Sequence, residues 1–206
     1  MPNLYPAFAR QEVVVHTPRH ATSLTDLSGD EIELVARAWQ TRAAAHPEGY
    51  VHAFVNEGRQ AGASREHTHS QLVWLGDVPP VPAEERELAE LLTGEVVLER
   101  EGLVLLCPRA SRLPYELLVA PAEPESGAFT GPRLAAALRL AAEGIRRVRV
   151  LEPEVPLNLW LHDLPWWHLE LVPRLTVLAG LELGAGVFVN PLPPEEVAVR
   201  LRSAEA

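Results

Sequence analysis

The sequence predicts an α+β fold in which two similar halves pair their sheets into one extended antiparallel sheet, with helices packed on one side of it. Three observations support this prediction. The chain has 206 residues and is 47% hydrophobic, which is enough for one large core or for two small packed domains. Short segments in which apolar and polar residues alternate are typical of half-buried strands. The order of strands and helix predicted for the first half returns in the second half, as expected for an internal repeat.

The first half, residues 1–82, is expected to hold an extended start, then a strand, a helix and two more strands. The first strand is EVVVHTP, and the helix runs over residues 30–45. Ser28 and Glu31 form a capping-box pattern at its start, and four apolar residues recur at helical spacing: Ile32, Val35, Trp39 and Ala43. The two strands that follow are YVHAFVNEG and HTHSQLVWL.

The second half, residues 83–206, is expected to repeat this order after a Pro- and Glu-rich connection over residues 77–93, which could hold a short helix over 83–92. Strands are expected in GEVVLER, LVLLCPR and YELLVAP, and a helix over 132–148. LNLWLHDLP and WWHLELVPRL then close the half as two further strands. Superposition of the halves places Trp166 on His67, His168 on His69, and Glu170 on Gln71.

Composition excludes several classes of protein. The formal charge of -10 argues against nucleic acid as a partner, because affinity for a phosphate backbone comes largely from clustered basic residues. Cys107 is the only cysteine, so neither an intrachain disulfide nor a thiolate-rich zinc cage is expected. No apolar run is long enough to span a bilayer, and the first residues do not resemble a signal peptide. We therefore expect a cytoplasmic protein with no membrane partner.

Three closely spaced polar residues form a candidate catalytic site. His67, His69 and Gln71 are spaced by two residues, so on a strand all three side chains project from one face. The preceding stretch NEGRQAGAS offers glycines that let backbone amides approach an anion, and Asn56 and Ser64 add polar side chains. A neutral, oriented imidazole is a competent nucleophile toward phosphorus. The alternative is that the two histidines bind a metal or lie at a surface.

The string FVNEGRQAGASREHTHSQL closely resembles the active-site segment of the galactose-1-phosphate uridylyltransferase family, in the histidine-triad superfamily. Thr68 stands where that family usually has Pro. PNLYPAF, VVHTPRHATSLTDLS and the tail from WHLELVPRL onward also resemble their counterparts, so the likeness covers nearly the whole chain. It implies two histidine-triad-like halves, with His69 as the nucleophile and Gln71 as the amide that steadies the phosphate. The positions that contact phosphate match Asn56, Gly62 and Ser64.

The resemblance also implies two metal sites. His20 and His67 match two ligands of a zinc site whose Cys-x-x-Cys pair is absent here. We favour the interpretation that both histidines form hydrogen bonds, because structural zinc needs four ligands. The second site matches the ligands Glu85, His162, His168 and Glu170, a set that suits zinc or iron. Trp166 stands where many relatives have another histidine, Glu84 could replace Glu85, and both histidines could instead be ordinary half-buried residues.

The step Gly180, Leu181, Glu182 resembles the stretch that contacts the sugar, with Glu182 accepting hydroxyl hydrogen bonds; the alternative is a glycine-rich turn before a last strand. The resemblance implies transfer of a nucleoside monophosphate, expected to be uridylyl, between a nucleotide sugar and a hexose 1-phosphate through a covalent nucleotidyl-histidine, as in galactose metabolism. No organic cofactor is expected, and a homodimer stays open. Two alternatives remain: a phosphorylase or hydrolase of the same superfamily, and a pseudoenzyme that binds nucleotide without turnover. Relatives carry a further segment before the Asn-x-Tyr-Pro stretch, at which this chain starts, and that difference favours the pseudoenzyme. The intact His69 and Gln71 favour the enzyme, which is the function that we predict.

Overall fold

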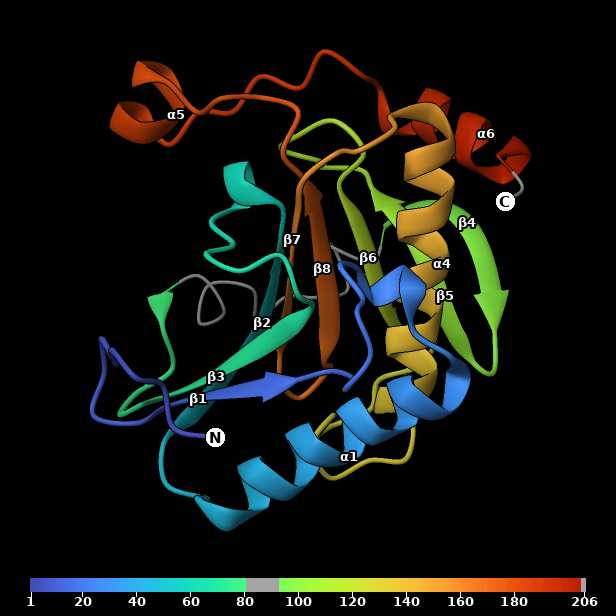
Figure 1. Cartoon of the computed structure of the whole chain (residues 1–206). Helices are drawn as coiled ribbons and strands as arrows, with labels where there is room; N and C mark the ends of the chain where they lie inside the picture. Colours follow the sequence, from blue (N-terminus) through green and yellow to red (C-terminus); the bar gives the residue numbers. More distant parts are fainter. Residues whose placement is uncertain (81–92, 205–206) are drawn as a thin grey trace.

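A computed structural model describes residues 1–80 and 93–204 of the chain. Its central feature is one eight-stranded antiparallel sheet with the strand order β1-β3-β2-β7-β8-β6-β5-β4 (Figure 1). The first half contributes three neighbouring strands and the second half contributes five. The predicted α+β fold with one extended antiparallel sheet is therefore confirmed.

The first half follows the predicted order of strand, helix, strand and strand. Ser28 accepts a hydrogen bond from the Glu31 backbone N–H, and the Glu31 carboxylate accepts one from the Ser28 N–H, so the helix starts in the expected capping box. Two single-turn 3₁₀ helices, η1 and η2, precede and follow the helix. The elements are β1 (Gln11–Val15), η1 (Leu24–Asp26), α1 (Gly29–Ala45), β2 (Tyr50–Glu57), η2 (Arg59–Ala61) and β3 (His69–Leu75).

The second half contains three strands, a long helix and two more strands, followed by two helices. Gly144 of the long helix lets it lie close to the sheet, since a Cβ atom there would come within 3.2 Å of a Leu105 methyl group. The elements are β4 (Gly94–Arg100), β5 (Leu103–Pro108), β6 (Leu117–Pro121), α4 (Leu134–Leu151), β7 (Leu157–His162), β8 (His168–Pro173), α5 (Gly180–Ala185) and α6 (Pro194–Ser203).

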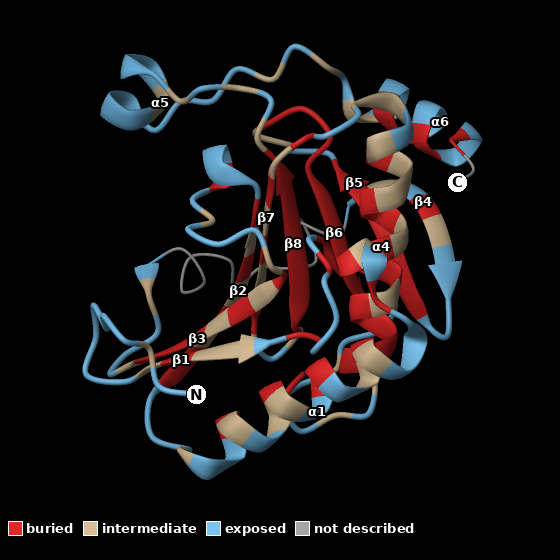
Figure 2. Cartoon of the chain, in the orientation of Figure 1, coloured by how far each residue is buried: buried red, intermediate tan, exposed pale blue. Residues whose placement is uncertain are grey.

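The halves are joined by the antiparallel ladder between β2 and β7, in which Asn56 is the partner of Asn158. Helices α1 and α4 contact each other over one face of the sheet, and α6 contacts α4, β4 and β5 (Figure 1). Strands β5, β6 and β8 are buried along their whole length, whereas α1 exposes its outer side (Figure 2). Trp39 from α1 and Trp167 next to β8 are both fully buried in the one main core.

Alternation along the strands decides which residues face away from the helices. Ser70 and Leu72 of β3 face the helices, because Ser70 accepts a hydrogen bond from the Trp39 indole and Leu72 belongs to the core. His69 and Gln71 therefore lie on the opposite face. The same argument applies to β8, where Leu169 and Leu171 belong to the core. All the predicted polar residues of strands β2, β3, β7 and β8 share that opposite face: Asn56, His69, Gln71, His162, His168 and Glu170.

The structure departs from the sequence-based predictions at a few places. Strand β3 starts at His69, so His67 precedes it. Strand β6 starts at Leu117, since Tyr115 has a φ of 59°, outside the extended region. Residues 180–185 form helix α5, where the alternative was a turn before a last strand, and α6 was not predicted. The candidate helix over residues 83–92, with Glu84 and Glu85, lies outside the described residues.

A membrane-spanning segment was not expected, and among the described residues no helix combines the length and the apolar character that crossing a bilayer needs.

Candidate active site

His69 stands at the first position of β3 and is half-buried. Its Nδ1 atom lies 2.8 Å from the carbonyl oxygen of His67. A carbonyl oxygen can only accept a hydrogen bond, so Nδ1 carries the proton in the neutral ring. The lone pair is then on Nε2, and His69 has the tautomer that an imidazole nucleophile requires.

Thr68, at the position where the family pattern has Pro, is buried and bonded on three sides. Its backbone N–H donates to the Ala21 carbonyl at 2.8 Å, its carbonyl accepts from the His16 N–H at 3.3 Å, and its hydroxyl lies 2.9 Å from His16 Nδ1. Burial, with smaller contributions from His69 and His67, lowers the pKa of His16 to about 3, so this imidazole is neutral near pH 7. These contacts hold the backbone of residues 67–69 in place without adding charge.

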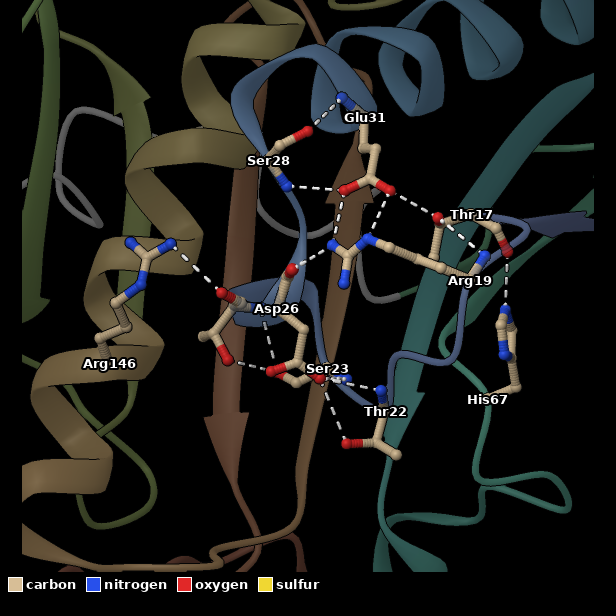
Figure 3. A network of polar contacts seen from close by, with 10 residues as sticks. Thr17, Arg19, Thr22, Ser23, Asp26, Ser28, Glu31, His67 and Arg146 are labelled. Carbon is tan, nitrogen blue, oxygen red and sulfur yellow. Dashed lines mark hydrogen bonds and ion pairs between the residues drawn. The ribbon is translucent and has the colours of Figure 1, made fainter.

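A polar network fixes the segment that precedes α1 and connects it to His67 (Figure 3). The Arg19 guanidinium forms an ion pair with Glu31 at 2.6 Å, and the Thr17 hydroxyl donates to the same carboxylate at 2.5 Å. The His67 Nε2 atom lies 2.9 Å from the Thr17 carbonyl oxygen and donates to it (Figure 3). The start of α1 therefore helps to position the loop that leads into His69.

Gln71 lies two residues after His69 and faces the same side of the sheet. Its Oε1 atom accepts a hydrogen bond from Nε2 of Gln11, on the neighbouring strand β1, at 2.6 Å. This contact commits the oxygen end of the Gln71 amide. Its NH₂ end is left to donate, as expected of a group that steadies a phosphate.

The glycine loop connects β2 to His69 through η2. Gly58 and Gly62 have φ angles of 84° and 89°, which side-chain-bearing residues rarely adopt. A Cβ atom on Gly58 would also lie 2.9 Å from Pro156. Asn56 accepts a hydrogen bond from Asn158 Nδ2 at 2.8 Å, and the same nitrogen donates to the Ala61 carbonyl at 2.8 Å. Asn158 thus anchors the loop from the second half, a role that the sequence did not reveal.

Two cavities lie beside this loop. The first, of about 310 Å³, holds the predicted nucleophile and its neighbours, and it is lined by Met1–Tyr5, Val13, Val15, Ser64, Arg65, His67, His69 and Gln71. The second, of about 500 Å³, is lined by Gly58, Arg59, Ala63, Ser64, Arg65 and Glu66. Ser64 and Arg65 line both.

The structure brings together four of the predicted site residues at the first cavity, namely Ser64, His67, His69 and Gln71. Asn56 and Gly62 lie in the adjoining loop, where Asn56 Nδ2 is 3.6 Å from the position of a Cβ on Gly62. Glu182 is not among the residues that line either cavity. It lies in α5, which is exposed and projects from the body of the molecule, and it caps that helix by accepting from the Ala179 N–H (Figure 2).

His162, His168 and Glu170 form the one cluster of three or more candidate metal ligands among the described residues. All three are buried and their ligand atoms lie within 4.8 Å of one another, with His162 Nδ1 3.2 Å from His168 Nε2. Two imidazoles and a carboxylate are a donor set that fits zinc or iron. The Glu170 carboxylate also forms an ion pair with Arg112, which binds Glu116 at 2.9 Å as well. His20 belongs to no such cluster.

The site combines a glycine loop with a strand-borne histidine, on one antiparallel sheet. The family model "Galactose-1-phosphate uridyl transferase, N-terminal domain" matches residues 5–80. Residues 5–80 of the chain therefore match the galactose-1-phosphate uridylyltransferase family.

Relatives match far beyond the region that the family model covers. An ADP-glucose phosphorylase from Arabidopsis thaliana is 28% identical over 95% of this chain, which spans 64% of the length of that protein. A galactose-1-phosphate uridylyltransferase from Thermotoga maritima is 27% identical over 94% of this chain and 74% of its own length. The chain therefore spans about two thirds to three quarters of these relatives.

Solved structures agree with the fold. The crystal structure of the Arabidopsis thaliana ADP-glucose phosphorylase with bound ADP-glucose superposes with a TM-score of 0.90, over 100% of this chain and 82% of that chain, at 24% identity. A uridylyltransferase mutant superposes with a TM-score of 0.91, over 99% and 84% of the two chains, at 22% identity. At these identities the superpositions establish the architecture.

Proposed function

We propose that this chain is a nucleotidyltransferase that moves a nucleoside monophosphate from a nucleotide sugar to an acceptor through a covalent bond to His69. The observation that carries the proposal is the hydrogen bond between His69 Nδ1 and the His67 carbonyl, which leaves the Nε2 lone pair for attack. The adjoining cavity has polar groups suited to phosphate, because Ser64, Arg65 and Gln71 line it.

The reaction has two steps. In the first, His69 Nε2 attacks the α-phosphorus, a P–N bond forms, and the P–O bond to the sugar 1-phosphate breaks, with the electron pair going to the leaving oxygen. Gln71 donates to a phosphate oxygen as negative charge builds on it. In the second step an acceptor oxygen attacks the same phosphorus and the P–N bond breaks, which returns the free imidazole.

Two acceptors are supported by different relatives. A hexose 1-phosphate would make the protein a uridylyltransferase, as the name of the Thermotoga maritima relative states. Inorganic phosphate would make it a nucleotide-sugar phosphorylase, as the name of the Arabidopsis thaliana relative states. The nucleotide is accordingly proposed as a uridine or an adenosine nucleotide.

Trapping of the intermediate tests the proposal. The protein is incubated with UDP-glucose or ADP-glucose labelled with ³²P in the α-phosphate and is then separated from free nucleotide. A phosphoramidate on histidine survives alkali and is lost in acid, which separates it from a carboxyl phosphate or a trapped ligand. His69→Asn should abolish labelling and turnover, whereas Trp166→His, in the other half of the repeat, should leave labelling unchanged. Turnover by His69→Asn at the parent rate would exclude the covalent mechanism.

A structural metal at His162, His168 and Glu170 is proposed as a support for the second half. Of the four predicted ligands, these three are brought together, and they lie on strands β7 and β8. Zinc or iron there would stabilise the folded chain and take no part in the transfer of the nucleotidyl group.

A further inference from the structure

A chain of two hydrogen bonds leads from the N-terminal segment to Gln71. The backbone N–H of Ala7 lies 2.8 Å from Oε1 of Gln11. A backbone N–H can only donate, so this contact identifies the oxygen end of the Gln11 amide and makes its other end the NH₂ group. That NH₂ group donates to Gln71 Oε1 at 2.6 Å.

These two hydrogen bonds decide which end of the Gln71 amide faces the cavity beside His69. With Oε1 of Gln71 committed to Gln11, the Gln71 NH₂ group is left to donate toward a ligand in the cavity that Gln71 and His69 both line. The reversed orientation would present a carbonyl oxygen to the phosphate, with no proton to share. One neighbouring side chain therefore decides whether this amide attracts or repels an anion.

The two glutamines meet because of the register of the sheet. Strand β1 pairs with β3 so that Val13 is opposite Gln71 and Gln11 is opposite Val73. Gln11 and Gln71 are diagonal neighbours on one face, and both are half-buried. Water competes less well for a half-buried hydrogen bond, so this contact can hold the Gln71 amide in one orientation.

We propose that Gln11 is a positioning residue, which holds the Gln71 amide with its NH₂ group toward the phosphate during formation of the nucleotidyl-histidine. This inference rests on the proposed function, and it assigns a role to a residue outside the predicted active-site segment. Gln11 does not touch the reacting atoms. Its effect passes entirely through Gln71.

Two substitutions separate this role from simple support of the N-terminal segment. Gln11→Glu keeps the length of the side chain and an acceptor for the Ala7 N–H, but it cannot donate to Gln71 and would draw the Gln71 NH₂ group toward itself. Gln11→Leu removes both polar ends without adding charge. Both should slow labelling of His69 by UDP-glucose or ADP-glucose by about 10-fold or more, approaching the 10²- to 10³-fold expected for loss of one oriented donor. The effect should fall on kcat more than on KM.

The same substitutions in a Gln71→Leu background show whether the effect passes through Gln71. In that background neither Gln11 variant should slow labelling by more than about twofold, since coupled residues are not additive. If Gln11→Glu slowed labelling only through its negative charge, it would still slow labelling in the Gln71→Leu background. Gln40→Leu is the matched control, because the Gln40 amide makes a comparable half-buried hydrogen bond, to the Gly131 carbonyl at 2.7 Å, away from the site. The inference would be overturned if both Gln11 variants labelled His69 at the parent rate while Gln71→Leu labelled it slowly. That result would leave the proposed function intact.

A readout that needs no turnover distinguishes failure of the inference from failure of the proposed function. In side-chain amide ¹H–¹⁵N spectra, the Gln71 NH₂ protons of the parent protein should exchange readily with water, since they face the cavity. In Gln11→Glu they should exchange more slowly and shift, because the carboxylate binds them. Unchanged Gln71 signals would overturn the inference even if no nucleotide labels the protein. Shifted signals without labelling would support the positioning role and count against the proposed function.

Discussion

His16 shows how a single buried side chain can make the fold around strand β3 sensitive to acid. The residue is 4% exposed, and its Nδ1 atom is hydrogen-bonded to the hydroxyl of Thr68, the residue before His69. The protonated form of His16 is disfavoured by burial and by the nearby His69 and His67, which together lower its pKa to about 3 from the ordinary 6.5. In the unfolded chain no such penalty applies.

The predicted consequence is a loss of stability on acidification. Between pH 6.5 and 3 the unfolded state binds a proton at His16 that the folded state does not, so the free energy of unfolding should fall as the pH is lowered from about 6.5. The slope from this one group should approach about 1.4 kcal/mol per pH unit. Urea unfolding of the parent and of His16→Phe at pH 7, 6 and 5 measures it. Equal slopes in the two proteins would contradict this assignment.

At the same scale, some site residues were readable from the sequence and others were not. The spacing of His69 and Gln71 was enough to place them on one face of a strand. Gln11 and His16 lie far from them along the chain. The pairing register of β1 with β3 brings Gln11 to Gln71, and just beyond β1 His16 contacts Thr68, the residue before His69. A cross-strand partner depends on that register, which a local pattern does not contain.

Among the elements, η1, the end of β2 and α4 are held together by a buried carboxylate. Glu57 is 3% exposed and accepts hydrogen bonds from the Ser23 hydroxyl at 2.8 Å and the Leu24 N–H at 2.6 Å. The Arg149 guanidinium of α4 lies 2.8 Å from the same carboxylate. This contact connects the second half of the chain to the strand that leads into the glycine loop.

Removal of the cation from this contact should be costly. Arg149→Met leaves a buried carboxylate without its counter-ion, and we expect the free energy of unfolding to fall by about 2–4 kcal/mol, somewhat reduced by the two remaining hydrogen bonds. Arg37→Met is the matched control, since Arg37 is exposed and pairs with Glu33 at only 3.5 Å. The control should stay within about 0.5 kcal/mol of the parent. Denaturant titration of the three proteins decides the matter, and similar losses in both variants would argue against a special role for Glu57.

Strands β7 and β8 supply the proposed metal ligands, and metal content tests the proposal directly. Protein purified without an affinity tag should contain close to one equivalent of zinc or iron, because structural sites normally stay occupied. His168→Ala should lose both the metal and thermal stability. Elemental analysis is the measurement, and less than about a tenth of an equivalent per chain would favour a site held together by hydrogen bonds and Arg112.

The order of the strands and the two long helices was predictable because each carries a strong periodic signal. Helix α6 carries a weaker periodic signal. Its first residue, Pro194, follows the N-cap residue Pro193, and the three residues Val197, Ala198 and Leu201 are buried at helical spacing. Helix α5 has no buried residue, so the sequence contains no apolar face from which this helix could be predicted. The capping contact between Glu182 and Ala179 is local, and it gave Glu182 a structural role that the family pattern did not suggest.

The whole molecule has one sheet and one main core, so its halves should unfold together. Trp39 of α1 and Trp167 next to β8 are buried in the same core and report on different halves. The chain has five tryptophans, so the test uses two variants in which Phe replaces all but one of them, one that keeps Trp39 and one that keeps Trp167. Each should give a single fluorescence transition that coincides with loss of circular dichroism. Two separated transitions within one variant would indicate halves that fold as independent domains.

The outer edge of β1 is covered by the beginning of the chain. The Asn3 N–H donates to the Gln11 carbonyl, the Val13 N–H donates to the Met1 carbonyl, and Pro2 bridges to Glu12. An uncovered edge strand is a template on which another molecule can add a strand. Deletion of residues 1–4 should therefore cause the protein to aggregate at high concentrations at which the parent stays monodisperse. Light scattering is the measurement. In this respect, the segment that forms a wall of the cavity beside His69 would also keep copies of the protein from polymerising.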